Sequence, residues 1–465
     1  MTLDSTELKE VKLSDEIILA ATLNNVFKNV DISESGLSAV SISTDNLYVK
    51  QGRFDGDDLE LINTNIPNAK FRVGCTSPEL VVMPSKGIGL WWSEDGITFT
   101  RGKMEDGSDT SSSWDCGCWD GEKFIFGGDN GIIYSSDGKT WKTTPYTNTA
   151  NEIKHFYDEV TDKHWYTCGT FVTTETDPTK WKFDGLYTDH DPGAYLYSKH
   201  MMIIWVDKWT LETEGTPFTS QGIYSVKFDD ENTPIYTKLT PPPGVEVGNF
   251  EWGGFDGFLN AKLMIGGKLT ECVVMPGFKA GGHFGLSYTV DGENIKIAKG
   301  GNPPDGCNPY EDWGFETPSV TKDGGIIVGS QLPKTPFYSH WKDLEEDPVQ
   351  CTLDGIPMVF GKPIIKDGFA SSPEYSEVGK CWIGCAYKKF EFQIIYSYDG
   401  INWYSSDCKG KFTGPTFFKN QALFGDQDGT VMRFDLTKST QKYIDIISVL
   451  KDLQKKIDYL FNKYS

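Results

Sequence analysis

The heptapeptide Ser135-Ser136-Asp137-Gly138-Lys139-Thr140-Trp141 decides how this chain folds. It follows a short apolar run that ends at Tyr134, and its composition is that of a tight turn between two strands. In such a turn the aspartate accepts hydrogen bonds from backbone N–H groups two residues on, the glycine takes a positive φ, and the aromatic ring folds back onto the sheet. We therefore expect a hairpin whose structural residues are Ser135, Asp137, Gly138 and Trp141.

The same unit recurs along the chain. Residues 93–99 and 397–403 repeat it, with structural positions at Ser93, Asp95, Gly96, Phe99, Ser397, Asp399, Gly400 and Trp403. Looser copies occur at residues 289–292 and 177–181. A repeat of roughly 40 to 50 residues that holds four short strands has the period of a β-propeller blade. The sequence thus predicts an all-β fold, a β-propeller of seven or eight four-stranded blades.

Composition narrows the possible partners. The chain has 465 residues, of which 38% are hydrophobic and 14% aromatic, and 49 glycines punctuate its short apolar runs. Its formal charge of −22 would repel nucleic acid and anionic membranes, so neither is expected as a partner. The sequence contains no run of about 18 apolar residues, so no membrane-spanning segment is predicted. The first twenty residues lack the features of a signal peptide, which predicts a protein made in the cytoplasm without that export route.

The ten cysteines are expected to be reduced thiols that pack as small apolar residues. Cys116 with Cys118, and Cys381 with Cys385, leave a metal site as the alternative. Their spacing fits no common zinc pattern. We therefore expect neither a metal nor a cofactor.

Both ends of the chain differ from the repeats and divide it into three parts. Residues 1–36 carry helix-compatible apolar positions such as Leu8, Val11 and Ile17, and they predict either an N-terminal docking arm or a terminal segment that lies on the main domain. The β-propeller is expected over residues 37–436. Strands within 38–63 would complete the last blade, at 417–434, because a closed ring leaves no open sheet edge.

Residues 437–465 predict a C-terminal oligomerisation helix. Apolar residues alternate at spacings of three and four over three heptads, which is typical of a coiled-coil seam. Ile447 and Phe461 widen this apolar face and favour a parallel trimer over a dimer. The alternative is an amphipathic helix packed on the propeller. The seam positions are Tyr443, Ile446, Leu450, Leu453, Ile457, Leu460 and Tyr464.

The recurring turns resemble the Asp-box hairpins of sialidases and related β-propellers. That resemblance implies turns on the blade rims that take no part in chemistry. Phe71-Arg72-Val73-Gly74 is also similar to the Phe-Arg-Ile-Pro motif that carries the first of three substrate-binding arginines in sialidases. The proline is missing, however, and no arginine lies between Arg101 and Arg433. Lysine cannot replace a bidentate arginine clamp, so sialidase activity is not expected.

A second resemblance concerns the organisation of the whole chain. A docking arm, a propeller and a trimerising helix in an acidic, unexported protein resemble a bacteriophage tail fibre or receptor-binding protein, as found on phages of Gram-positive hosts. This resemblance implies a homotrimer in the virion tail that binds other phage tail proteins and a host-surface glycan, without enzymatic activity. The alternatives are a glycoside hydrolase, for which Asp115 and Asp120 are the nearest to a carboxylate pair, and an interaction scaffold.

Aromatic residues in or beside loops rich in glycine and aspartate are the candidate glycan platforms. Adjacent Trp91 and Trp92 point to opposite faces of their strand, so one of them is expected to be exposed. Each ring could instead pack between blades. The glycan-binding candidates are Trp91, Trp92, Trp114, Trp119, Trp252, Tyr310 and Trp313.

Overall fold

The computed structural model describes residues 70–183, 185–188, 193–243, 258–265, 268–280, 283–299, 373–388, 391–397, 403–410, 412–426 and 429–437. It also describes short strands before residue 63, between residues 319 and 370, and at 443–445. Almost all regular structure in these parts is β-strand. The short helical segments are η2 (Pro178–Lys180), η3 (Tyr197–Lys199) and α1 (Lys208–Glu212). No helix among the described residues is long and apolar enough to cross a membrane.

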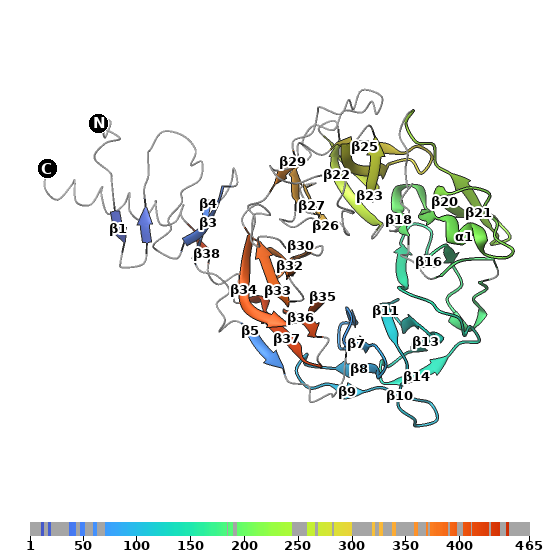
Figure 1. Ribbon diagram of the computed structural model, residues 1–465, viewed down its shortest axis with the longest axis horizontal. Helices are drawn as coiled ribbons and strands as arrows, with labels where there is room; N and C mark the ends of the chain where they lie inside the picture. Colours follow the sequence, from blue (N-terminus) through green and yellow to red (C-terminus); the bar gives the residue numbers. More distant parts are fainter. Residues whose placement is uncertain are drawn as a thin grey trace, which may run out of the picture.

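Small antiparallel sheets follow one another around a ring, so the chain folds as a β-propeller (Figure 1). Every sheet of the ring except the last is built from strands within one stretch of the sequence, as the repeated turns predict. The strands of the first half of the ring are β6 (Cys75–Thr76), β7 (Val81–Ser85), β8 (Gly89–Ser93) and β9 (Thr100–Arg101); β10 (Lys103–Met104), β11 (Trp114–Trp119), β12 (Phe124–Gly128), β13 (Gly131–Ser135) and β14 (Thr140–Thr143); β15 (Lys154–Asp158), β16 (Lys163–Cys168) and β17 (Phe171–Thr173); and β18 (Ala194–Leu196), β19 (Met201–Val206), β20 (Gly222–Phe228) and β21 (Pro234–Lys238).

The second half continues in the same way and ends next to the first sheet (Figure 1). Its strands are β22 (Leu259–Ile265), β23 (Lys268–Ala280), β24 (His283–Thr289) and β25 (Lys296–Lys299); β26 (Ser319–Val320), β27 (Gly325–Val328), β28 (Phe337–His340) and β29 (Met358–Phe360); β30 (Phe369–Ala370), β31 (Glu374–Ser376), β32 (Cys381–Lys388), β33 (Glu391–Ser397) and β34 (Trp403–Gly410); and β35 (Phe412–Phe418), β36 (Gln421–Asp426) and β37 (Val431–Asp435) with β5 (Leu59–Ile62).

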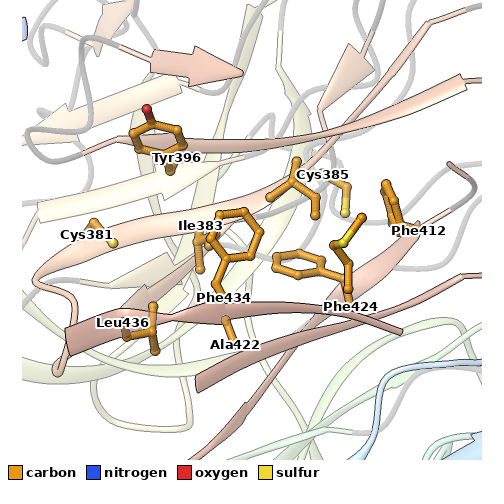
Figure 2. Packing of buried hydrophobic residues seen from close by; sticks show 11 residues of the cluster. Cys381, Ile383, Cys385, Tyr396, Phe412, Ala422, Phe424, Phe434 and Leu436 are labelled. Carbon is orange, nitrogen blue, oxygen red and sulfur yellow. The ribbon is translucent and has the colours of Figure 1, made fainter. Parts of the chain in front are cut away.

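The hydrophobic cores lie between neighbouring sheets, because successive residues of a strand point to opposite faces. In β19, Met201, Ile203 and Trp205 pack toward the β22–β25 sheet, whereas Met202, Ile204 and Val206 pack toward the β15–β17 sheet. Figure 2 shows the same arrangement where the β32 sheet meets the last sheet, with Cys381, Ile383 and Cys385 against Ala422, Phe424 and Phe434. Burial on both faces explains why these strands are continuously apolar.

The ring is closed by residues from opposite ends of the chain. Strand β5 pairs antiparallel with β37, with Val431 opposite Ile62 and Phe434 opposite Leu59. The last sheet therefore takes its fourth strand from the N-terminal part of the chain. This pairing agrees with the closure expected from residues 38–63, although only 59–62 take part in it.

The described terminal strands depart from the sequence prediction. Strands β3 (Leu37–Ile42) and β4 (Leu47–Gln51) form a separate sheet with β38 (Tyr443–Asp445), so the ring does not begin at residue 37. Tyr443, the first seam position, thus lies in a strand and not in a helix. The helix-compatible N-terminal segment likewise contains a hairpin of β1 (Val11–Leu13) and β2 (Ile17–Leu19). The seam positions from Ile446 to Tyr464 lie outside the described residues.

Strand order gives each sheet two distinct ends. Consecutive antiparallel strands place the first and third turns at one end of the sheet and the second turn at the other. The aspartate turns are third turns, between β8 and β9, between β13 and β14, and between β24 and β25. We call the side of the ring that carries the first and third turns the turn face.

Candidate functional site

The turn at residues 135–141 is held by one serine and one aspartate. Asp137 Oδ1 accepts hydrogen bonds from the backbone N–H groups of Lys139 (2.8 Å) and Thr140 (2.7 Å) and from Ser135 Oγ (2.8 Å). Gly138 has a φ of 67°, and Trp141 is fully buried. The turns at Asp95 and Asp291 have the same pattern of N–H donors, so the copy at residues 289–292 is as regular as the sharper ones. Asp399 and Gly400 lie outside the described residues.

The glycine of each described aspartate turn lies against the preceding sheet. A Cβ at Gly138 would overlap Leu80 in the first turn of the β6–β9 sheet. A Cβ at Gly96 would lie 2.8 Å from Gln421 Oε1 at the start of β36, and one at Gly292 would overlap Met201 at the start of β19. The aspartate turns are therefore contacts between sheets as well as hairpins. Because these turns recur, they hold neighbouring sheets of the ring at a similar distance from one another.

Gly138→Ala is expected to destabilise the protein more than Gly107→Ala. Both glycines have a positive φ, 67° and 83°, which costs a non-glycine residue about 1–2 kcal/mol. A Cβ at Gly107 has open space around it, whereas one at Gly138 meets Leu80 and Phe124. Overpacking adds about 1–3 kcal/mol, so urea unfolding should show a gap of that size between the variants. Equal losses would contradict the contact between sheets.

The candidate tryptophans that the structure describes are packed between sheets. Trp114 is buried, and Trp91, Trp92 and Trp119 are only partly exposed and contact the same inter-sheet cores. Lys139 Nζ lies 4.4 Å from the Trp92 ring centroid and covers it. The sequence predicts that one of Trp91 and Trp92 is exposed, whereas both rings are half-buried, because both faces of their sheet are covered. Trp252, Tyr310 and Trp313 lie outside the described residues.

The candidate carboxylate pair has structural roles instead. Asp120 is buried in the first turn of its sheet, where Lys123 Nζ (2.8 Å) and Tyr166 Oη (2.7 Å) both donate to its Oδ2. Tyr166 belongs to the next sheet, so this carboxylate links two sheets. Asp115 instead forms an ion pair with Arg72, at 3.4 Å from Nε. Arg72, the residue of the sialidase-like motif, is thereby directed to a neighbouring strand.

Asp158 occupies the corresponding position in the β15–β17 sheet. Its Oδ2 accepts hydrogen bonds from Tyr195 Oη (2.9 Å) and Thr161 Oγ1 (2.6 Å) and lies 2.6 Å from His200 Nδ1. Burial opposes ionisation, but hydrogen bonds from Thr161, His200 and Tyr195 lower the pKa of Asp158 to about 2. An ionised carboxylate only accepts, so His200 Nδ1 carries the hydrogen of this contact.

Two more histidines lie beside this first turn. His155 Nε2 is 2.9 Å from His164 Nδ1, and the rings stack at an angle of 26°. Burial lowers the pKa of His155 to about 4, so this ring is neutral at neutral pH. Sequence reasoning missed this pair, although residues 154–157 (KHFY) and 163–166 (KHWY) repeat one pattern on paired strands.

Large apolar side chains remain exposed at the first turns of three successive sheets. They are Tyr157 and Val160 near the turn of the β15–β17 sheet, Tyr197 in the next, and Leu269 in the β22–β25 sheet. Tyr197 and Ser198 donate their backbone N–H groups to the Glu271 carboxylate, at 2.8 and 2.7 Å. This part of the turn face thus combines exposed rings with side chains fixed by hydrogen bonds.

Glu374 in β31 is influenced by the charge of Glu152, just before β15. The surrounding protein disfavours the charged form of Glu374, and together with the charge of Glu152 it raises the pKa of Glu374 to about 7. Because the Glu374 side chain is exposed, solvent screening weakens this shift. Glu152 is itself paired with Lys154, at 3.6 Å.

The described cysteine side chains are thiols buried in the cores, at Cys75, Cys118, Cys168, Cys272, Cys381 and Cys385. Burial raises the pKa of Cys75 to about 12, which keeps this thiol protonated and unreactive. No group of three or more histidine, cysteine, aspartate or glutamate side chains in the described part of the chain is arranged to hold a metal ion.

Comparison with known proteins finds matches among solved structures. No protein-family model and no curated protein matches the sequence. Solved structures similar to this one include the Dos1 propeller, with 9% identity, a TM-score of 0.45, and coverage of 82% of this chain and 96% of that one. YCF48 from Cyanidioschyzon merolae has 8% identity and a TM-score of 0.44, covering 81% and 98%. The WD40 β-propeller domain of Doa1 has 11% identity and a TM-score of 0.40, covering 81% and 96%.

Proposed function

We propose that this chain is a bacteriophage tail fibre or receptor-binding protein that attaches the virion to a host cell-surface glycan without cleaving it. The observation that carries this proposal is the turn face, where exposed rings lie among side chains that donate and accept hydrogen bonds. Sugar rings offer apolar faces and hydroxyl groups side by side, and they need both kinds of partner. The buried Asp120 and its neighbours serve packing instead of chemistry.

The remaining parts of the chain complete this role. We assign each of the eight sheets from β6–β9 to β35–β37 with β5 to one blade of an Asp-box propeller. Residues 1–36 dock onto other phage tail proteins, and a helix with its seam from Ile446 to Tyr464 makes the homotrimer. Three copies of one weak site raise avidity by orders of magnitude, which suits attachment. A sedimentation mass equal to one chain would contradict the trimer.

The test uses capsule, wall polysaccharide and wall teichoic acid purified from Gram-positive cells. We expect the full chain to be retained on at least one immobilised polymer and to leave its chain length unchanged after long incubation. Retention on none of them would overturn the proposal. A shortened polymer would contradict the proposal that the protein binds the glycan without cleaving it.

A glycoside hydrolase or depolymerase is the second candidate, and Glu374 with Glu152 favours it. Burial and the charge of Glu152 raise the pKa of Glu374, and a carboxyl group with a raised pKa suits a general acid. If product forms, Glu374→Gln should abolish it and leave retention on the polymer unchanged. Product formation by that variant at the wild-type rate would exclude this pair as its source.

A further inference from the structure

The hairpin of β15 and β16 carries a pair of histidines that attachment to a glycan does not use. His155 and His164 lie on these adjacent strands, and both side chains are half-buried. The Tyr166 ring packs against His155 at a centroid distance of 5.0 Å, and the Tyr157 ring packs against His164 at 4.9 Å. The facing atoms of the pair, His155 Nε2 and His164 Nδ1, are 2.9 Å apart. The two imidazoles are therefore held between two tyrosines on one face of the sheet.

Tyr166 connects this pair to the preceding sheet. Its ring contacts His155, and its hydroxyl donates to the buried Asp120 carboxylate at 2.7 Å. Asp120 lies in the first turn of the β11–β14 sheet, where Lys123 Nζ also donates to it, at 2.8 Å. A displacement of the His155 ring therefore acts on the side chain that links the two sheets.

The contact between the two imidazoles tolerates one added proton but not two. A hydrogen bond between ring nitrogens needs one N–H donor and one unprotonated acceptor. This requirement is met when both rings are neutral and when one of them is charged. When both are charged, each facing nitrogen carries a hydrogen, and two positive charges lie across a gap of 2.9 Å. Like charges at this distance in a half-buried site repel each other, so the rings must separate.

The charged groups that face the pair compensate for a second proton only in part. Burial disfavours a charged His155 most strongly; the Asp120 carboxylate favours that charge, whereas His164 and Lys123 oppose it. The Asp120 carboxylate is already shared by the Lys123 ammonium and the Tyr166 hydroxyl. On its own strands the pair is flanked by the hydroxyls of Tyr157 and Tyr166 and, through Tyr157, by the carboxylate of Asp162.

We propose that His155 and His164 form an acid-sensitive switch on the seam between the β11–β14 and β15–β17 sheets, closed with at most one added proton and open with two. Opening withdraws the His155 ring from Tyr166 and loosens the link from Tyr166 to Asp120. The folded pKa of His155, about 4, lies below the value of about 6.5 for an unfolded chain. The stability that the closed pair contributes is thus fully present above pH 6.5 and is lost as the pH falls toward 4.

The experiment replaces both imidazoles by amides, which take up no proton. In the double variant His155→Gln, His164→Asn, one amide lies near the position of Nε2 and the other near that of Nδ1, so a hydrogen bond across the pair is retained. Urea unfolding of the full chain is measured at pH 7 and pH 4.5. From pH 7 to pH 4.5 we expect the unfolding constant of wild type to rise by up to about a hundredfold more than that of the variant, because each proton costs about tenfold per pH unit.

His200→Asn is the matched control. It removes an imidazole from another seam, where His200 Nδ1 contacts Asp158, and leaves the pair intact, so it should keep at least the wild-type loss in acid. An acid loss in the double variant equal to that of wild type would overturn the switch. If the double variant is already less stable at pH 7, His155→Gln alone replaces it, because a single imidazole cannot bring two charges to the pair.

Hydrogen exchange measured by mass spectrometry locates the opening. At pH 4.5, peptides that cover residues 120–123 should exchange faster in wild type than in the double variant, whereas at pH 7 the two should exchange equally fast. Comparing both proteins at one pH removes the intrinsic effect of pH on exchange. Equal exchange of these peptides at pH 4.5 would overturn the transmission from His155 through Tyr166 to Asp120. Neither measurement needs a ligand, so both stand apart from the attachment function.

Discussion

Replacing Trp141 by alanine is expected to lower the free energy of unfolding by about 3–5 kcal/mol, the usual cost of deleting a buried aromatic side chain. Trp141 is fully buried between the first two sheets, with its ring centroid 5.6 Å from that of Phe126 and 6.4 Å from that of Phe124. Gly102, after β9, approaches so closely that a Cβ there would lie 2.7 Å from the indole Nε1. The indole thus connects the aspartate turn of one sheet to the backbone that leaves the sheet before it.

The variant Trp141→Phe keeps an aromatic ring and removes the indole N–H, so it separates the contributions of the two to stability. The indole N–H is buried and has no hydrogen-bond partner among the described residues. Removing this unsatisfied group offsets part of the stability that is lost when the indole is replaced by the smaller phenylalanine ring. We expect a loss of about 1 kcal/mol for phenylalanine. Urea unfolding of the two variants beside wild type measures both values. If Trp141→Ala lowered the free energy of unfolding no more than Trp141→Phe does, the packing of the ring between the two sheets would not stabilise the fold.

The turns and the period of the fold could be predicted because their chemistry is local. An aspartate that binds its own backbone and a glycine with positive φ need no knowledge of the rest of the chain. The copies at Asp95 and Asp137 therefore identify hairpins from seven residues each. The contact that Gly138 makes with Leu80 could not be predicted in this way, since it joins residues of different sheets.

The tryptophan candidates show where such reasoning stops. Alternation along a strand places Trp91 and Trp92 on opposite faces, which in a two-layer protein would expose one of them. In a ring of sheets both faces of each sheet are covered. Alternating residues of a strand therefore pack into the core shared with the preceding sheet or into the core shared with the following sheet. Exposure then depends on distance from the turns, as Tyr157 and Tyr197 show.

Asp120 was a reasonable catalytic candidate in sequence, yet a second pattern marks it as structural. An aromatic residue and an aspartate precede the first turn, and a lysine follows it, both at Trp119–Lys123 and at Tyr157–Lys163. Recurrence at equivalent places in two sheets indicates a framework role, because a catalytic residue has no reason to repeat. The hydrogen bonds of Asp120 and Asp158 to tyrosines of the following sheets supply the physical cause.

Asp120→Ala is expected to cost about 3–5 kcal/mol, as when one partner of a buried ion pair is removed. The change leaves the Lys123 ammonium and the buried Tyr166 hydroxyl without their acceptor. Glu122→Ala is the matched control, because the Glu122 side chain is 86% exposed and lies 4.0 Å from the same ammonium. Such a surface pair contributes about 0–1 kcal/mol. Similar losses for both variants would contradict a structural role for Asp120.

Asp120 should also make the stability of the protein depend on pH. Burial alone would raise the pKa of Asp120, but hydrogen bonds from Lys123, the Glu122 N–H and Tyr166 lower it below its ordinary value. A group with a depressed pKa in the fold stabilises fully above its unfolded value of about 3.9, and this contribution is lost as the pH falls through the folded pKa. Wild type should therefore lose stability below about pH 4 more steeply than Asp120→Ala, measured as urea midpoints between pH 7 and pH 2. Parallel curves would mean that Asp120 is not held ionised by its neighbours, and the link between the two sheets would then need another source.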